Sequence, residues 1–266
     1  MKVLVGSPVS KHHKYCAPQY LEMLKNLSYS NYDVLLVDNS DTEDFYNEIK
    51  DKVLIVRFGY DKETIKERMV ASRNYIREYV LKNGYDYFMD IDQDVIPPKD
   101  VIERMLAHKK DFVSGIYYNY FEQIPGKREK MPVAYTWFTK DDIGRIMGDL
   151  EKVKVKDPPL YRALVTKNFD FSQLMRPLSE EEIKSGKLIK IRSCGSGCTL
   201  VSRRALEAVP FRNNYIGGFD DVLFCIDLLE KGFELYADCS VVCDHLNENK
   251  PWEWTRVGKI TDIIYK

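Results

Sequence analysis

The stretch YDYFMDIDQDVIPP, residues 85–98, decides how the rest of the chain can be interpreted. Aromatic and apolar residues dominate positions 85–89, which predicts a buried strand. Asp90, Asp92 and Asp94 follow at alternating positions, and two prolines then end the regular structure. Carboxylates gathered at the end of a buried strand need a positive partner, and carboxylate oxygens suit hard divalent cations. The stretch therefore predicts a metal site at the exit of a central strand.

The overall charge of the chain excludes some classes of partner. Its 266 residues contain 40 basic and 41 acidic side chains, so the net charge is −1. This balance does not predict a nucleic-acid-binding protein. Hydrophobic residues make up 44% and charged residues 30%, which is typical of a globular protein with a sizeable core.

No signal peptide or transmembrane segment is expected, because no apolar stretch is long enough. The six cysteines lack the spacing of a secreted disulfide framework, so we expect reduced thiols. A cytoplasmic protein is the resulting expectation, with peripheral contact at a membrane through its partner as an option. Two Cys-x3-Cys pairs, at 194/198 and 239/243, offer a zinc alternative, but buried small apolar cysteines fit the spacing better.

The first part of the chain alternates between strand and helix patterns. Strands are predicted at 2–5, 32–40, 53–59, 85–89 and 111–118, and helices at 18–27, 42–49, 62–82 and 100–108. Thr42 is the expected N-cap of the second of these helices. This alternation predicts an α/β fold with a mixed, mostly parallel, Rossmann-like central sheet flanked by helices. Ligands of such sheets bind beyond the carboxyl ends of the strands, where Ser7, Asp38 and the three aspartates lie in sequence.

The pattern loosens after residue 120 and becomes regular again near the C-terminal end. Residues 139–186 are rich in charge and predict surface loops and short helices, with a lid over a cleft as one option. The remaining predicted elements are strands at 132–138, 233–237 and 240–245, helices at 203–208 and 219–232, and two short strands around a glycine-rich bend within 188–202. The last strand delivers His245 at its end.

Three kinds of site use alternating aspartates. An EF-hand loop requires glycine and glutamate where Val95 and Val101 stand, so it is excluded. A haloacid-dehalogenase-like phosphatase would use Asp90 as nucleophile and Asp92 as acid, although its motif normally opens the domain. A cation that bridges a diphosphate to the protein explains best why acids follow a buried strand. A solvated acidic turn is the alternative without function.

Several motifs, in order along the chain, resemble those of nucleotide-sugar glycosyltransferases of the GT-A fold, closest to family 2. They are Gly6-Ser7-Pro8, Val37-Asp38-Asn39-Ser40, Ala71-Ser72-Arg73-Asn74, Asp92-Gln93-Asp94 with its trailing prolines, Gly195 to Arg203, Phe219-Asp220-Asp221 and His245. No single motif is specific, but their common order is typical of this fold.

The resemblance implies a nucleotide-sugar site. Its residues would be Ser7, Pro8, Asp38, Asn39, Arg73, Asn74 and Asp92. A guanidinium is suited to bidentate phosphate contact, so Arg73 and Asn74 are expected near the nucleotide or diphosphate. The alternative for Arg73 is an ion pair on the helix surface.

The resemblance also implies a metal site and a base. Asp92, Asp94 and His245 would hold Mn²⁺ or Mg²⁺, with imidazole favouring Mn²⁺ modestly. A strand-end histidine with a structural hydrogen bond is the alternative for His245. Asp221, assisted by Asp220, would take the proton from the acceptor hydroxyl. The alternative is that both aspartates stabilise the helix by placing negative charge at its N-terminus, without a role in catalysis.

The expected activity follows from these roles. It is metal-dependent transfer of a hexosyl group, of the inverting type, from a UDP- or GDP-linked donor to a glycan, lipid-linked or protein acceptor. Residues 1–120 would form the nucleotide-sugar-binding half, and residues 121–266 the acceptor-binding half of the same domain, with the loop-rich insertion at 139–186. The alternatives are the phosphatase and a GT-A module that binds sugar or nucleotide without catalysis.

Overall fold

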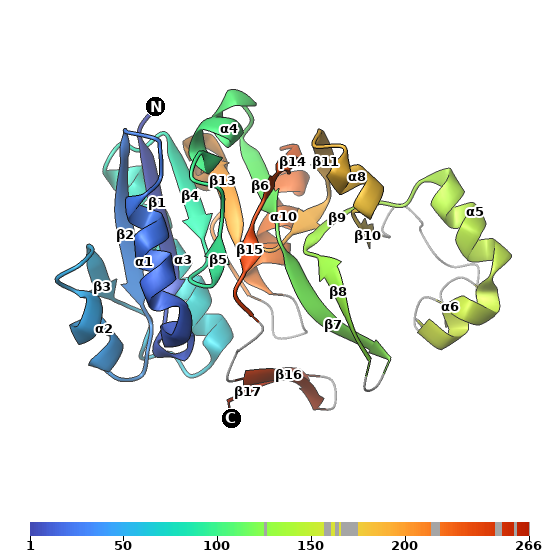
Figure 1. Ribbon diagram of the computed structural model, residues 1–266, viewed down its shortest axis with the longest axis horizontal. Coiled ribbons are helices and arrows are strands. Elements are labelled where there is room, and N and C mark those ends of the chain that lie inside the picture. Colours follow the sequence, from blue (N-terminus) through green and yellow to red (C-terminus); the bar gives the residue numbers. More distant parts are fainter. Residues whose placement is uncertain are drawn as a thin grey trace.

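A mixed sheet forms the centre of the molecule (Figure 1). The computed structural model describes residues 1–124, 127–156, 161–162, 165, 175–213, 219–247, 252–257 and 260–265. Within these residues the central sheet has eight strands, in the spatial order β11 (Leu188–Ile191), β14 (Leu235–Val242), β6 (Phe112–Ile116), β13 (Cys198–Ser202), β4 (Tyr87–Ile91), β1 (Val3–Val9), β2 (Tyr32–Asp38) and β3 (Ile55–Arg57). The predicted α/β class with a mixed, mostly parallel sheet is confirmed.

Strand direction changes in the middle of this sheet. The pairs β4–β1, β1–β2, β2–β3 and β14–β6 are parallel. β13 runs antiparallel to both of its neighbours, β4 and β6, and β11 runs antiparallel to β14. Because β13 is reversed, its first residue, Cys198, lies opposite Ile91, the last residue of β4. The glycine-rich bend before β13 is therefore placed at the carboxyl end of β4.

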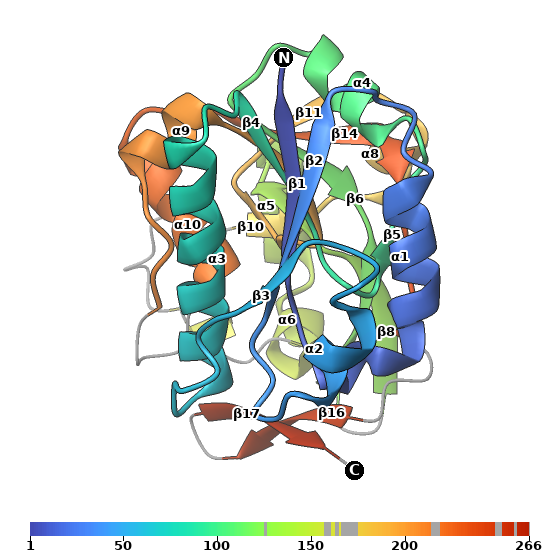
Figure 2. The same cartoon turned by 90° about the vertical axis from the view of Figure 1, so that its left-hand side faces the viewer.

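Helices flank the central sheet on two sides (Figure 2), and an apolar core fills the space on each face. Side chains alternate across a strand, so Val3 and Val5 of β1 belong to one core and Leu4 to the other. The first core includes side chains from α1 (Ala17–Lys25), α2 (Asp44–Ile49) and α4 (Val101–Ala107). The second includes side chains from α3 (Ile65–Lys82), α8 (Glu180–Lys184), α9 (Arg203–Ala208) and α10 (Asp220–Glu230).

Smaller sheets surround the central one. They are β5 (Val95–Ile96) with β15 (Asp244–His245), β7 (Tyr118–Ile124) with β8 (Lys127–Pro132), β16 (Trp252–Val257) with β17 (Ile260–Tyr265), and β10 (Met175–Pro177) with β9 (Ala134–Trp137) and β12 (Ser193–Cys194). The helices α5 (Lys140–Gly148) and α6 (Leu150–Lys156) extend from one end of the molecule (Figure 1). No helix of the described residues is long and apolar enough to cross a membrane.

Two helix starts differ from the predicted ones. The helix expected from Thr42 begins at Asp44, and Glu43 precedes it without a side-chain cap. The long helix expected from Lys62 begins at Ile65, because Thr64 forms a reciprocal capping box. In that box the Thr64 hydroxyl accepts a hydrogen bond from the backbone of the third helical residue, which satisfies one free N–H group at the helix start.

The later part of the chain contains more strand than the sequence pattern predicts. The hairpin of β7 and β8 was not expected, and 188–202 holds three strands rather than two. The two final strands expected at 233–237 and 240–245 are largely one strand, β14, with an irregular register after Ala237. The end of the second becomes β15, in which His245 pairs with Val95 of β5.

Candidate active site

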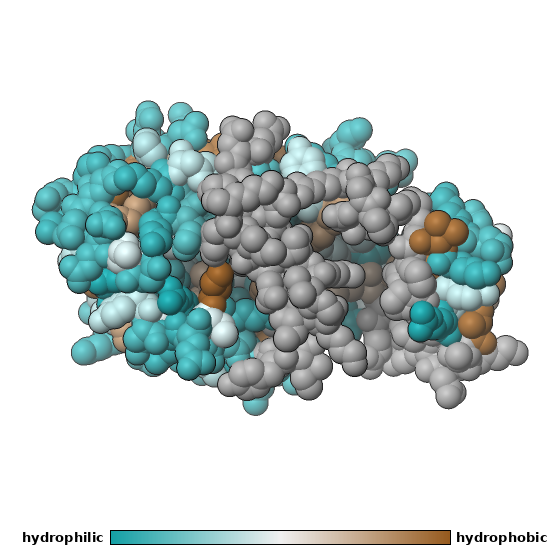
Figure 3. Space-filling view, turned by 90° about the horizontal axis from the view of Figure 1, so that it is seen from below, coloured by the Kyte–Doolittle hydropathy of each residue, from teal (hydrophilic) through white to brown (hydrophobic). Residues whose placement is uncertain are grey.

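The candidate site lies where β1, β2 and β4 end, and the described surface on this side of the molecule is mostly hydrophilic (Figure 3). β4 carries Asp90 as its penultimate residue, and Asp92 follows the strand directly. The backbone N–H of Asp92 donates to the carbonyl of Gly197, 3.1 Å away, in the bend before β13. This bond joins the acidic loop to a segment more than one hundred residues later in the chain.

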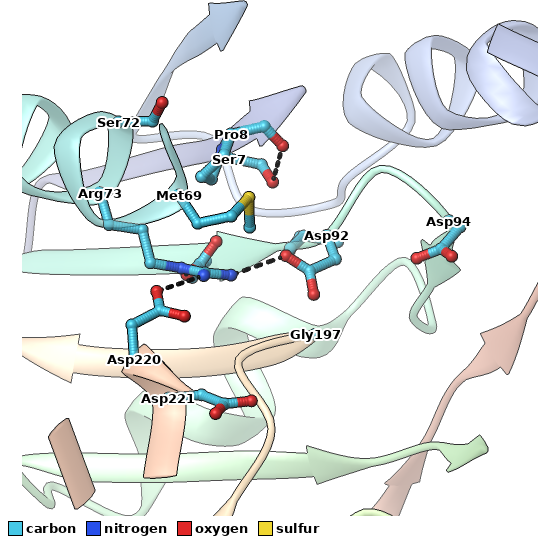
Figure 4. Close-up of polar contacts among 12 residues, drawn as sticks. Ser7, Pro8, Met69, Ser72, Arg73, Asp92, Asp94, Gly197, Asp220 and Asp221 are labelled. Carbon is cyan, nitrogen blue, oxygen red and sulfur yellow. Dashed lines mark hydrogen bonds and ion pairs between the residues drawn. The ribbon is translucent and has the colours of Figure 1, made fainter. Parts of the chain in front are cut away.

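Arg73 of α3 binds three carboxylates at once (Figure 4). Its Nε donates to Asp90 Oδ2 at 2.9 Å, its Nη2 to Asp92 Oδ1 at 2.9 Å, and its Nη1 to Asp220 Oδ2 at 2.7 Å. The side chain of Arg73 is only 3% exposed. Each nitrogen of the guanidinium thus bonds a different acid, and the network joins α3, the end of β4 and the start of α10.

The position of Arg73 differs from one interpretation of the sequence. An ion pair on the helix surface does not fit a buried side chain. Each guanidinium nitrogen already donates to an acid, so only the second N–H of Nη1 and of Nη2 is left for a phosphate contact. The neighbouring Asn74 also has a structural partner. Its amide donates to the carbonyl of Phe211 at 2.8 Å and accepts from the same residue's N–H at 3.0 Å. The structure therefore does not bring the Asn74 amide into this cluster of acids.

Three acids around one guanidinium leave excess negative charge. The pKa of Asp90 is raised to about 7, mainly by burial; the Arg73 charge lowers it, and the charge of the nearby Asp92 adds to the rise. Burial also raises the pKa of Asp92. Among the described residues, Asp90 Oδ1 is buried without a hydrogen-bond partner. A proton on Asp90 near neutral pH reduces this excess charge.

The burial of Asp90 also bears on the phosphatase alternative. That mechanism needs Asp90 as an exposed nucleophile, but the residue is 1% exposed and bonded to Arg73. A carboxylate in this position cannot approach a phosphate ester. The geometry therefore does not support phospho-aspartate chemistry at Asp90.

Asp221 is the acid in the first turn of α10 next to Asp220. Its Oδ1 accepts a hydrogen bond from the backbone N–H of Val222 at 2.6 Å. Burial, with a smaller contribution from the charge of the adjacent Asp220, raises the pKa of Asp221 to about 7. Figure 4 places its carboxyl group on the side of Asp220 away from α3, below the bend at Gly197. A carboxylate with a pKa near 7 is suited to accept a proton in a reaction at neutral pH.

Asp94 and His245 meet through the pairing of β5 with β15. The imidazole Nε2 lies 3.2 Å from Asp94 Oδ2, while Nδ1 lies 2.7 Å from the carbonyl of Tyr118. A carbonyl only accepts hydrogen bonds, so Nδ1 carries a proton and Nε2 faces the carboxylate. This orientation, fixed by an outer hydrogen bond, is common for metal-binding histidines.

A third side chain approaches the same oxygen. His13, in the 3₁₀ helix η1 (Lys11–Cys16) after β1, places Nε2 3.6 Å from Asp94 Oδ2. The sequence analysis missed His13. Its position just past the first strand was the only signal, because that is the edge at which ligands of parallel sheets bind.

The donor set fits a divalent cation. A carboxylate oxygen and an imidazole nitrogen that face each other at this distance share either a proton or a cation. Asp94 and His245 are arranged in this way, and Asp92 belongs to the same loop. In the part of the chain that the structure describes, no three histidine, cysteine or acidic side chains already form a closed metal-binding group. The cysteines of the zinc alternative, at 194, 198, 239 and 243, are all buried and form no disulfide.

The residues predicted to contact the nucleotide lie at the ends of β1 and β2. Ser7, at the end of β1, is fully buried, and its hydroxyl donates to the carbonyl of Pro8 at 3.0 Å. Asp38 is buried, with Oδ1 accepting from Ser40 and Oδ2 lying 3.4 Å from Nε of Arg57. Burial raises the pKa of Asp38. Arg57 is a second residue that the sequence analysis missed.

Asn39 extends this group toward α3. Its amide donates to the hydroxyl of Ser72 at 3.2 Å, one residue before Arg73. Ser7, Pro8, Met69 and Ser72 lie on the other side of Arg73 from Asp220 (Figure 4). Of the predicted nucleotide residues, Ser7 and Pro8 therefore lie on one side of Arg73, while Asp220 and Asp221 lie on the other.

Comparison with known proteins supports a transferase site. Residues 16–209, more than half of the chain, match the model of Glycosyl transferase family 2. No curated protein matches the chain. One similar solved structure is GalNAc-T7 with UDP, GalNAc and Mn²⁺, at 10% identity and a TM-score of 0.53. The alignment covers 92% of this chain but only 44% of that one, and it shows a shared fold.

Another similar structure, A197 from STIV, aligns over 100% of this chain and 94% of its own at 14% identity. Its TM-score of 0.43 is too low to carry an argument. The family match covers β2, β4, the acidic loop, Arg73 and β13, whereas β1, α10 and β15, which also contribute site residues, lie outside it. The chain therefore belongs to glycosyl transferase family 2, a family of nucleotide-sugar glycosyltransferases.

Proposed function

We propose that this protein transfers a sugar from a UDP- or GDP-linked donor to an acceptor hydroxyl with the help of a divalent cation. One observation carries the proposal. Arg73 bonds Asp92, in the loop predicted to hold the metal, and Asp220, beside the predicted base, at the same time. The two halves of a transfer site are thereby held at a defined separation.

The donor would lie across the ends of β1 and β2. Ser7, Pro8, Asp38 and Asn39 form the nucleotide end of this proposed site. The Arg57 guanidinium, which lies next to the fully buried Asp38 carboxylate and is itself partly exposed, offers donors for a base edge or a ribose. Arg73 and Asn74 would position the site rather than contact the donor. Arg73 bonds the acids, and Asn74 bonds the backbone of Phe211.

Asp92, Asp94 and His245 would hold Mn²⁺ or Mg²⁺, which neutralises charge on the departing nucleoside diphosphate when bound. Asp221 accepts the proton of the acceptor hydroxyl while the oxygen of that hydroxyl forms a bond to the anomeric carbon. The bond from that carbon to the diphosphate oxygen breaks, and its electron pair leaves with the diphosphate. Asp220, fixed by Arg73, keeps Asp221 at the start of α10. Such a single displacement inverts the anomeric configuration.

The first test is metal-dependent nucleotide binding, measured by thermal denaturation. UDP or GDP should raise the melting temperature only when Mn²⁺ or Mg²⁺ is present. At a nucleotide concentration one hundred times its dissociation constant, the free energy of unfolding should rise by about 2.7 kcal/mol. Asp94→Ala should abolish the shift, because the cation would lose its central carboxylate.

The matched control is Asp61→Asn, which changes an exposed carboxylate outside this site. It should keep the full nucleotide shift. If no common nucleotide changes the melting temperature with either cation, the proposal fails. Binding in the absence of any sugar transfer would instead indicate a non-catalytic module.

A further inference from the structure

The side chain of His13 lies against the proposed metal site and has no role in the scheme above. Its Nε2 is 3.6 Å from Asp94 Oδ2, the same oxygen that lies 3.2 Å from Nε2 of His245. The two histidines come from opposite ends of the chain. One follows β1, and the other ends β15. Two imidazoles thus direct nitrogen atoms at one carboxylate oxygen.

Gln93 holds His13 in this place. Its side-chain carbonyl accepts from the N–H of Ser10 at 2.9 Å, and its amide donates to the carbonyl of His13 at 3.0 Å. The thiol of Cys16 donates to the backbone carbonyl of Gln93 at 3.3 Å. Gln93 stands between Asp92 and Asp94 and is 4% exposed. These bonds attach the turn that carries His13 directly to the acidic loop.

The distances match those between two ligands of one metal ion. Ligand atoms about 2.0–2.2 Å from a cation and separated by right to tetrahedral angles lie roughly 3.0–3.5 Å from each other. The separations of 3.2 and 3.6 Å around Asp94 Oδ2 are close to this range. The three side chains do not yet surround a common point. Rotation of the partly exposed His13 ring, whose side chain is 27% accessible, would close the set.

We propose that His13 is a metal ligand that completes a set of two imidazoles and one carboxylate with Asp94 and His245. This inference rests on the metal dependence of the proposed function. Imidazole nitrogen favours Mn²⁺, Co²⁺ and Zn²⁺, whereas Mg²⁺ prefers oxygen ligands and retained water. A second imidazole therefore makes the site selective for nitrogen-binding transition metals over Mg²⁺.

The test measures metal binding without sugar transfer. Pulsed electron paramagnetic resonance of Mn²⁺ on the wild-type protein should detect two coordinated imidazole nitrogens. His13→Asn should leave one, and calorimetry should show Mn²⁺ affinity about 10–100-fold weaker, as for loss of a metal-site partner. Mg²⁺ affinity should change less than about threefold. Melting curves confirm that the variant is folded.

The control is His12→Asn, on the same turn. His12 stands next to His13 in η1 and supplies an imidazole that the proposed ligand set does not include. This variant should keep two nitrogens and wild-type affinities for both metals. Since the wild-type spectrum counts nitrogens directly, the inference can be tested even if His13→Asn does not fold.

The outcomes separate this inference from the function on which it rests. A wild-type spectrum with one nitrogen, or His13→Asn with unchanged Mn²⁺ affinity, overturns the role of His13 and leaves the glycosyltransferase proposal intact. Absence of any Mn²⁺ or Mg²⁺ binding to the wild-type protein, with and without UDP or GDP, overturns both.

Discussion

At the scale of single residues, the buried guanidinium of Arg73 organises the site. Arg73 is the donor in hydrogen bonds to Asp90, Asp92 and Asp220, and these acids come from two distant parts of the sequence. An Arg-to-Lys change would keep the charge but lose the planar fork that bonds three partners. The geometry of the guanidinium, rather than its charge alone, sets where the acids lie.

Asp221 gives a prediction for the pH dependence of activity. Burial and Asp220 raise its pKa to about 7, so the carboxyl is protonated and inactive as a base at lower pH. We expect kcat/KM to fall about tenfold for each pH unit below 7. Asp221→Asn should lower kcat by about 10²–10⁴-fold and leave nucleotide binding unchanged.

The matched control is Asp227→Asn on the same helix, where the carboxylate pairs with Arg212 at the surface. Its pH profile and kcat should equal those of the wild-type protein. Transfer at the normal rate by Asp221→Asn would show that another group takes the proton.

At the scale of elements, the bend before β13 explains why glycines stand at 195 and 197. A Cβ on Gly195 would lie 1.9 Å from the hydroxyl oxygen of Tyr117, and one on Gly197 would lie 2.7 Å from its ring. Tyr117 in turn packs edge-on against His245, with ring centroids 5.3 Å apart. The bend, Tyr117 and the predicted metal ligand therefore form one packed unit.

Gly197→Ala should disturb this unit. The added methyl group must displace the buried Tyr117 ring, and overpacking of this kind costs about 1–3 kcal/mol of unfolding free energy. Displacement of Tyr117 should also weaken Mn²⁺ binding by moving His245. Chemical denaturation and calorimetry measure the two effects.

Gly144→Ala serves as the control, because a Cβ at that exposed position in α5 meets nothing within 4 Å. It should leave metal binding unchanged and stabilise the protein by up to about 1 kcal/mol, since alanine favours helix. Equal behaviour of the two alanine variants would contradict the packed unit.

The sequence predicted most elements but not their partners. Short apolar runs indicated β1, β2 and β4, and regularly spaced apolar residues indicated α1 and α3, because burial in a sheet or on a helix face leaves a local pattern. The insertion of β13 between β4 and β6 leaves no such signal. Strand neighbours are chosen by contacts between distant segments, so this step was invisible before the structure.

At the scale of the whole molecule, the buried acids make stability depend on pH. The pKa of Asp90 is raised to about 7, above its ordinary value. The folded protein therefore retains a proton that the unfolded chain releases near pH 4. The stabilisation that this proton gives the folded state is complete below the pKa of Asp90 in the unfolded chain. It is lost as pH rises through about 7, the pKa in the folded protein.

Asp90→Asn should remove this dependence, because an amide does not titrate. Between pH 5 and 8 the unfolding free energy of the wild-type protein should fall relative to the variant by about 3 kcal/mol. Urea denaturation at several pH values measures the difference in slope, so a constant loss from the changed bond to Arg73 does not affect it. Asp61→Asn should follow the wild-type slope, and parallel curves for Asp90→Asn would contradict a buried titrating acid at this position.

The sequence by itself determined the α/β class, the order of the main elements and the segments that carry the site. Those features follow from local patterns of apolar residues, from strand ends and from a short acidic motif. The tertiary structure alone decided that Arg73 binds three acids, that Asn74 bonds the Phe211 backbone, and that His13 faces Asp94. Hydrogen bonds and ion pairs depend on distances within a few ångströms between segments that the chain order does not bring together.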